Sequence, residues 1–207
     1  MTLFHRLFRQ DNWKTIPNAI TALRFVLLPV FVVLIVQQHY WSSMVVIAVV
    51  FFTDFLDGYI ARRTNTTSAL GAWLDPVADR VTVIVVVVAF VLGHLVPWPV
   101  LVLLLVPDVV LSTIALIAFG GAPFHVTWVG KFRTAFIFIG LLLILVGAAL
   151  VAQFSFDHNA LGFGFGEGLE NIGHVVLWVG LIGHYVAGAV YALALVRAWR
   201  AERAPLA

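Results

Sequence analysis

Six apolar stretches, each about as long as a bilayer is thick, constrain the fold of this chain more than any other feature. A transmembrane helix needs about 20 mainly apolar residues. Hydrophobic residues make up 62% of the chain and charged residues only 11%, which excludes an ordinary soluble domain. The sequence therefore predicts an all-α, polytopic membrane protein. The six predicted transmembrane helices are Asn18–Val36, Ser42–Ile60, Asp75–Leu92, Val100–Phe119, Val129–Ala152 and Ile172–Val196.

The segments between the predicted spans are short, so neighbouring helices are expected to be antiparallel and to form one bundle. We therefore predict a single membrane domain over residues 1–207. The glycine-rich run Leu161–Gly168 lacks the Lys-Ser/Thr end of a phosphate-binding loop and is interpreted as a flexible connection. His174 and His184 in the last span are interpreted as packing or hydrogen-bonding residues. The chain has no cysteine, which excludes disulfides and thiolate metal sites.

The basic residues predict the orientation in the membrane. If the six spans alternate, all 12 Lys and Arg residues fall at the same face, which is the cytoplasmic one. Both termini are then cytoplasmic. The segment Met1–Lys14 interleaves basic and large apolar residues, as a short amphipathic helix on an anionic membrane surface does. Arg24, inside the first span, either extends to the headgroup layer or pairs with the cluster of acidic residues between positions 54 and 79.

Four aspartates at the ends of two predicted hydrophobic helices indicate a functional site. Asp54 and Asp57 are three residues, one helical turn, apart on the second span, and Asp75 and Asp79 are at an i, i+4 spacing on the third. Ionisable groups at such depth are costly and usually functional. Four clustered carboxylates repel one another unless they take up protons or bind cations. All-oxygen ligands favour magnesium, manganese or calcium, and phosphate chemistry at a cytoplasmic face favours Mg²⁺.

Small and basic residues surround these aspartates. Gly58 and Ala61 leave space beside them, while Arg62 and Arg63 offer planar, permanently charged groups that match phosphate oxygens. Metal ions can neutralise charge on a diphosphate leaving group while a carboxylate accepts the proton of an attacking hydroxyl. The residues alone therefore indicate a phosphoryl-transfer or phosphatidyl-transfer site.

The spacing of these residues resembles the signature of the CDP-alcohol phosphotransferase family without a departure. The matching run is Asp54-Phe-Leu-Asp57-Gly58-Tyr-Ile-Ala61-Arg62, then eight residues, then Gly71-Ala-Trp-Leu-Asp75-Pro-Val-Ala-Asp79. The resemblance implies two Mg²⁺ ions, with Mn²⁺ as an alternative. Asp54 and Asp75 would bridge the ions, Asp57 would complete the shell of the first, and Asp79 would ligate the second and act as general base.

The resemblance also implies residues that bind the substrates. The CDP-lipid would be contacted by Gly58 and Arg62, given room by Ala61 and Gly71, and further contacted by Ser68 and, at the start of the first span, by Asn18 and Thr21. Lys131 and Arg133 resemble an acceptor-binding segment of the glycerol-type branch. The structural alternatives are an ordinary helix start at Pro17 and simple positive-inside charge at Lys131 and Arg133.

The expected reaction is transfer of a phosphatidyl group from CDP-diacylglycerol to a glycerol-type acceptor, with release of CMP. Glycerol 3-phosphate would give phosphatidylglycerophosphate, and phosphatidylglycerol would give cardiolipin. Asp108 can be protonated, hydrogen-bonded or paired with Arg24 or Arg80, and Pro107 stands where many glycerol-type relatives have an arginine. The alternative of another class is an ion or proton transporter, whose site would lie near mid-membrane. The family also implies a homodimer in the cell membrane with its active site at the cytoplasmic face.

Overall fold

The computed structural model describes most of the chain as helix. The described residues hold six α-helices and no strand, which confirms the all-α prediction. The segment Met1–Lys14, predicted to be an amphipathic helix, lies outside them. The described residues are 16–64, 69–119, 128–156 and 160–202.

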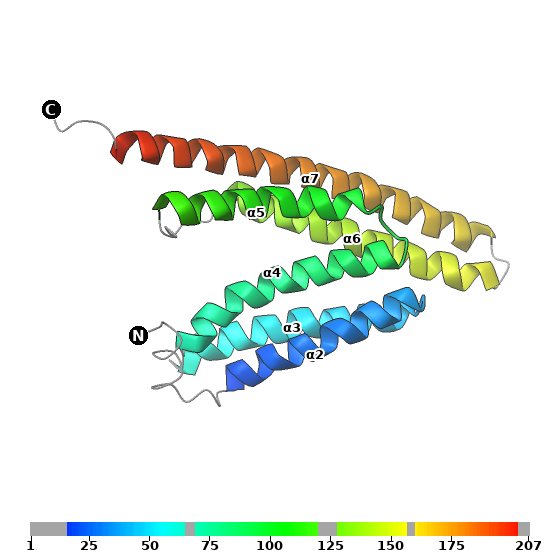
Figure 1. Cartoon of the computed structure of the whole chain (residues 1–207). Coiled ribbons are helices and arrows are strands. Elements are labelled where there is room, and N and C mark those ends of the chain that lie inside the picture. The colour runs from blue at the N-terminus through cyan, green and yellow to red at the C-terminus, as the bar shows by residue number, and fades with distance from the viewer. Residues whose placement is uncertain (1–15, 65–68, 120–127, 157–159, 203–207) are drawn as a thin grey trace. The chain divides into compact units, whose positions relative to one another are not determined.

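The chain divides into two compact units, Met1–His94 and Leu95–Ala207, and each is described by itself. The first unit holds α2 (Ile16–Val36), α3 (Tyr40–Thr64) and α4 (Ala69–Leu92). Helix α2 packs against both α3 and α4 (Figure 1).

The turn between α2 and α3 makes these two helices antiparallel. Gln38 adopts a left-handed backbone conformation with φ 61°, and the amide of His39 donates to the carbonyl of Leu34 at 2.9 Å. This bond satisfies a carbonyl that the end of α2 would otherwise leave without a partner. Because the turn is centred on Gln38, residues equally far from it along the chain lie at similar depth.

Helix α4 runs parallel to α2, and two contacts fix their register. The rings of Phe31 and Phe90 lie 6.5 Å apart, and a Cβ on Gly93 would lie 2.6 Å from Cγ2 of Ile35. Both contacts join positions that are 58 or 59 residues apart in the sequence. The described core of this unit includes Leu28, Phe31, Ile35, Val50, Val87 and Phe90, all buried.

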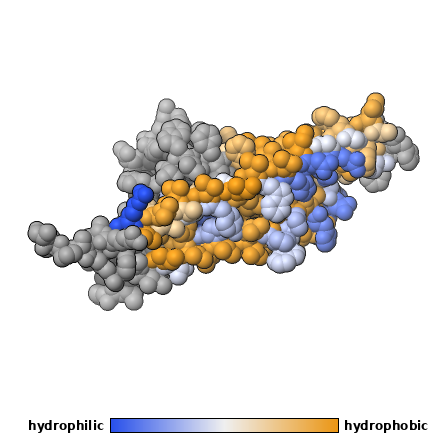
Figure 2. All heavy atoms as spheres, turned by 90° about the horizontal axis from the view of Figure 1, so that it is seen from above, coloured by the Kyte–Doolittle hydropathy of each residue, from blue (hydrophilic) through white to orange (hydrophobic). Residues whose placement is uncertain are grey.

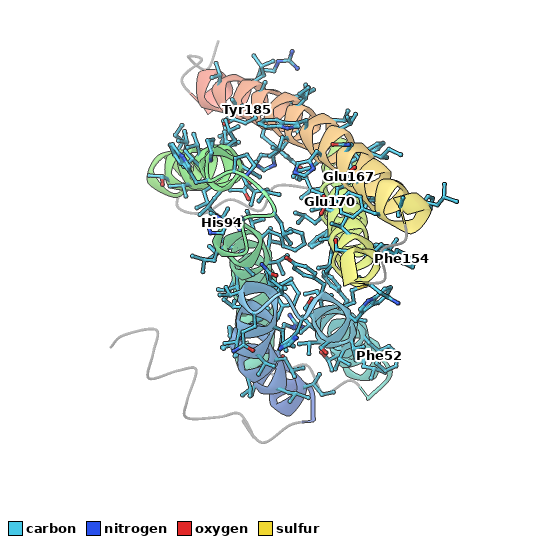
Figure 3. All side chains as sticks on the ribbon, turned by 90° about the vertical axis from the view of Figure 1, so that its right-hand side faces the viewer. Phe52, His94, Phe154, Glu167, Glu170 and Tyr185 are labelled. Carbon is cyan, nitrogen blue, oxygen red and sulfur yellow. The ribbon has the colours of Figure 1, made fainter. Side chains whose placement is uncertain are left out.

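The second unit holds α5 (Pro99–Phe119), α6 (Trp128–Phe156) and α7 (Ala160–Glu202). Helix α7 packs along α6 over most of the length of α6 and also contacts α5 (Figure 1). At the α6–α7 connection, Phe154 lies against the backbone of Gly162 (Figure 3).

A row of five glycines, here called the glycine seam, joins α6 to α7. A Cβ added to Gly173 would lie 2.7 Å from the backbone nitrogen of Ile144 and 2.9 Å from the carbonyl oxygen of Gly140. Real Cβ atoms do not approach backbone this closely, so only glycine allows the two helices to pack at this distance. The seam consists of Gly140 and Gly147 on α6 and Gly166, Gly173 and Gly180 on α7, each seven residues from the next on its helix.

The interpretation of Leu161–Gly168 as a flexible connection is wrong. Helix α7 begins at Ala160, twelve residues before the predicted start at Ile172. Glycine has low intrinsic helix propensity, but tertiary packing overrides it. Here Gly166 packs against the backbone of α6, so the glycines serve helix packing instead of flexibility.

The remaining helix bounds lie close to the predicted spans, with one difference at the site. Helix α4 starts at Ala69, six residues before Asp75, so Pro76 lies inside the helix and Asp75 does not cap it.

The described helices expose many large apolar side chains. Two stretches, Thr134–Ser155 and Ala160–Arg197, are long and apolar enough by length and composition to cross a membrane, and four shorter apolar stretches lie in α2 to α5. Hydrophobic residues cover much of the coloured surface in Figure 2, with hydrophilic residues between them. Along α7 the exposed large apolar side chains include Ile172, Val175, Trp178, Val179, Ile182 and Val186. Such a continuous apolar surface suits contact with lipid.

Candidate active site

The four aspartates lie in two helices that both pack on α2. Asp54 and Asp57 are in α3, and Asp75 and Asp79 are in α4. Each pair lies in uninterrupted helix, so the predicted spacing of about one turn within each pair is confirmed at the level of the backbone. Their side chains lie outside the described ones, and the described side chains contain no cluster of three His, Asp or Glu residues.

The register of α2 against α3 and α4 shows which residues of α2 lie at the same height along the helices as the aspartates. With the offset of 58 or 59 residues between α2 and α4, Thr21 is level with Asp79 or Arg80. Counted from the turn at Gln38, Thr21 is also level with Phe55 of α3, between Asp54 and Asp57. Three of the four aspartates thus belong to one layer of the first unit.

Two polar side chains of α2 are buried in this layer. Thr21 and Arg24 are each only 2% exposed. A side chain that extends to the headgroup layer would be exposed at its charged end, so burial excludes this interpretation of Arg24. The alternative, pairing with an acidic residue, stays as the prediction.

Two further buried threonines near the site are satisfied within their own helices. The Thr53 hydroxyl donates to the carbonyl of Val50 at 2.8 Å, and the Thr82 hydroxyl donates to the carbonyl of Ala78 at 2.8 Å. Such a bond to a carbonyl one turn earlier satisfies a buried hydroxyl group within its own helix. These hydroxyls are therefore structural.

The residues present suit a hard divalent cation. The acidic residues that the sequence brings to this layer offer oxygen ligands only, which magnesium and manganese prefer. Their helical backbones supply rigid positions, as a preorganised site requires. Metal binding by Asp54, Asp57, Asp75 and Asp79 stays a prediction.

The other predicted site residues are placed by their backbones alone. Asn18 lies in the first turn of α2, Gly71 in the first turn of α4, and Lys131 and Arg133 in the first two turns of α6. Ser68 lies outside the described residues. The remaining members, Gly58, Ala61 and Arg62, lie in α3 beyond Asp57. Their substrate contacts stay predictions.

In the second unit, a buried histidine supports the helix that carries Asp108. The Nε2 of His184 in α7 lies 2.9 Å from the carbonyl oxygen of Leu104 in α5 and 3.8 Å from Oδ1 of Asp108. Pro107 removes the backbone N–H that would bond the carbonyl of Leu103, and the His184 imidazole donates to the next carbonyl of the same turn, that of Leu104. The prediction that His184 is a hydrogen-bonding residue is confirmed.

The packing of α6 against α7 places Arg133, a predicted acceptor-binding residue, at the same height along the helices as His184. A Cβ on Gly180 would lie 2.8 Å from the backbone nitrogen of Ile137, so the antiparallel α6 and α7 are level there. Four residues further towards the start of α6 lies Arg133, and four residues further along α7 lies His184. Arg133, His184 and Asp108 thus share one layer. The sequence alone gave no signal for this, because the three residues lie on separate helices.

Comparison with known proteins identifies the family. A profile described as CDP-alcohol phosphatidyltransferase matches residues 14–196. The chain belongs to this family. The matched region contains all four aspartates and both predicted acceptor-binding residues, and this phosphatidyltransferase is therefore an enzyme with the intact family signature on α3 and α4.

Individual relatives of the phosphatidyltransferase carry two kinds of name. A putative cardiolipin synthase of Mycobacterium tuberculosis is 36% identical over 145 residues, covering 67% of this chain and 68% of the relative. A CDP-diacylglycerol--glycerol-3-phosphate 3-phosphatidyltransferase of Pseudomonas fluorescens is 46% identical over 82 residues, 38% of this chain and 42% of the relative. The human cardiolipin synthase (CMP-forming) is 37% identical over 102 residues, 49% of this chain and 34% of the relative.

Proposed function

We propose that this phosphatidyltransferase acts in phospholipid biosynthesis by transferring the phosphatidyl group of CDP-diacylglycerol to glycerol 3-phosphate. The products are phosphatidylglycerophosphate and CMP. The observation that carries the proposal is the family match over residues 14–196 together with the intact signature on α3 and α4. The relative from Pseudomonas fluorescens is named for this reaction.

The chemistry follows from the roles assigned to the signature residues. Asp79 accepts the proton of the acceptor hydroxyl, and the resulting alkoxide oxygen forms a bond to the lipid-linked phosphorus. The bond between that phosphorus and the oxygen bridging the diphosphate breaks, and CMP leaves with the electron pair. Two bound Mg²⁺ ions would offset the charge that develops on the diphosphate. Arg62 holds the diphosphate oxygens.

A second acceptor, phosphatidylglycerol, is supported by a separate observation. The relative aligned over the greatest share of this chain among those described above is named a putative cardiolipin synthase. In addition, Pro107 stands beside Asp108 where many glycerol-type relatives have an arginine, which leaves one cation fewer in the layer of Arg133 and His184. Both acceptors present a glycerol hydroxyl, so the same transfer step serves either.

One panel of acceptors tests the proposal. Purified enzyme with labelled CDP-diacylglycerol and Mg²⁺ is expected to release CMP with glycerol 3-phosphate and not with inositol phosphate or serine. The double variant Lys131→Gln/Arg133→Gln is expected to raise the KM for glycerol 3-phosphate about tenfold or more, because each lost charge-assisted hydrogen bond costs about 1.5–3 kcal/mol. The KM for CDP-diacylglycerol should stay unchanged. Turnover with phosphatidylglycerol alone would identify the enzyme as a cardiolipin synthase.

The proposal includes six transmembrane helices, cytoplasmic termini and a homodimer. The absence of cysteine allows a direct test of the topology with single-cysteine variants. In right-side-out membrane vesicles, a membrane-impermeant maleimide is expected to label Gln37→Cys and Gln153→Cys, which are exposed positions at the predicted outer face. Ala204→Cys should react only after the vesicles are opened. Labelling of Ala204→Cys in sealed vesicles would contradict the predicted orientation.

The transporter alternative is less well supported. A transport site would lie near the middle of its helices, between repeated halves. Here Asp57 lies in the second half of α3 and Asp75 in the first half of α4, towards the connection between the two helices, whereas Asp54 and Asp79 lie within two residues of the midpoints of their helices. The match of residues 14–196 to the phosphatidyltransferase family, and not the depth of the aspartates, therefore argues against a transporter.

A further inference from the structure

Arg24 carries a permanent charge inside a helix packed on two sides. Its side chain is 2% exposed, and α2 contacts both α3 and α4. A guanidinium group does not lose its proton in a protein, so burial cannot be relieved by neutralisation. A buried cation is tolerated only next to anions that compensate for its lost hydration. Arg24 must therefore lie in a strongly negative environment.

The sequence of this unit limits the source of that environment. The unit Met1–His94 has five acidic residues and no glutamate, and four of the five are the signature aspartates. Arg24 lies 14 residues before the centre of the α2–α3 turn, which makes it level with Phe52, two residues before Asp54. The α2–α4 register makes it level with Thr82 or Val83, one turn beyond Asp79. Arg24 thus lies on the membrane-inward side of the aspartate layer.

We infer that Arg24 is a positioning residue that serves as the internal counter-charge of the four-aspartate site. This inference rests on the proposed function, because it assumes that the aspartates bind the metal ions. The guanidinium group reduces repulsion among the carboxylates when the site is empty. Unlike Arg62, which is predicted to contact the CDP-lipid, Arg24 acts on the aspartates from the buried side of the layer.

The sign of the effect on metal binding follows from Coulomb's law. A fixed positive charge close to the site repels an incoming divalent cation, and its removal is expected to lower the dissociation constant for Mn²⁺ by about fivefold or more. A residue that only held the helices together would have the opposite effect, since a loosened site binds metal more weakly. Turnover should fall, because tighter metal binding and altered carboxylate positions disturb the transition state.

The test measures Mn²⁺ binding to the full chain in lipid nanodiscs by electron paramagnetic resonance, without substrate. Arg24→Gln is expected to bind Mn²⁺ about fivefold or more tightly than the wild type, and Arg24→Lys, which keeps the charge, is expected to match the wild type within about twofold. Arg197→Gln, an exposed arginine of α7, is the matched control and should leave the dissociation constant unchanged.

The outcomes separate this inference from the proposed function. If the wild type binds Mn²⁺ and Arg24→Gln binds it equally or less tightly, the counter-charge role is overturned and the metal site stands. If the wild type binds no Mn²⁺, the proposed metal binding is wrong, and the inference about Arg24 is wrong with it. If Arg24→Gln does not fold, the double variant Arg24→Gln/Asp54→Asn should restore folded protein, because it removes both charges. Failure to restore it would overturn the inference.

Discussion

The variant Asp79→Asn is expected to lose turnover by a factor of about a thousand or more while it remains folded. Asp79 lies in continuous α4 helix, and an amide preserves the size of the side chain. An amide cannot accept the proton of the acceptor hydroxyl, and general-base catalysis is worth about 10²–10⁴-fold in rate. The measurement is CMP release from CDP-diacylglycerol at saturating acceptor. Full turnover by the variant would exclude Asp79 as the base.

A matched variant and a second aspartate separate the two roles of Asp79. Glu167→Gln makes the same change of acid to amide at an exposed position of α7, labelled in Figure 3, and should retain full turnover. Asp54→Asn removes a predicted ligand but not the base, so a raised Mg²⁺ concentration should recover part of its activity. For Asp79→Asn, added Mg²⁺ should not restore the lost proton transfer.

The second large effect is expected in the glycine seam. Gly173→Ala should destabilise the protein by about 2 kcal/mol or more, although alanine has the higher helix propensity. The reason is that its Cβ would lie 2.7 Å from the nitrogen of Ile144 and 2.9 Å from the carbonyl oxygen of Gly140. Neither is the end of a flexible side chain, so α6 and α7 must move apart. The measurement is the free energy of unfolding in detergent micelles.

The same helix supplies the control for this substitution. Gly168 lies between the seam positions Gly166 and Gly173, but a Cβ there would meet no atom within 4 Å. Gly168→Ala should therefore leave stability unchanged or raise it by up to about 1 kcal/mol. Equal destabilisation by both variants would show that the effect comes from the loss of glycine in general and not from the contact between α6 and α7.

The sequence predicted the helices well where an apolar run ends in polar residues. The first and fourth predicted spans start within two residues of α2 and α5, because hydropathy alone marks these boundaries. The start of α7 was missed because glycine usually signals a loop, and its packing partner lies on another helix. The seven-residue spacing of Gly166, Gly173 and Gly180 was the available signal, since such spacing keeps residues on one helix face.

For the site, spacing within a helix was predictable and the environment between helices was not. The positions of Asp54 with Asp57, and of Asp75 with Asp79, follow from helical geometry alone. The burial of Arg24 depends on how α2 packs against α3 and α4, which no local pattern encodes. The layer shared by Arg133, His184 and Asp108 likewise depends on the register of three helices.

The glycine seam also bears on how this gene can vary. At its five positions every possible codon change to another residue adds a Cβ, and for each of them that atom would meet a neighbour at less than 3.0 Å. A library that samples every substitution and selects for folded enzyme should therefore recover glycine alone at these sites. The rejected positions would recur every seven codons along α6 and α7, whereas codons 164 and 168 would accept alanine. The contact between α6 and α7 could then be inferred from the selection data alone.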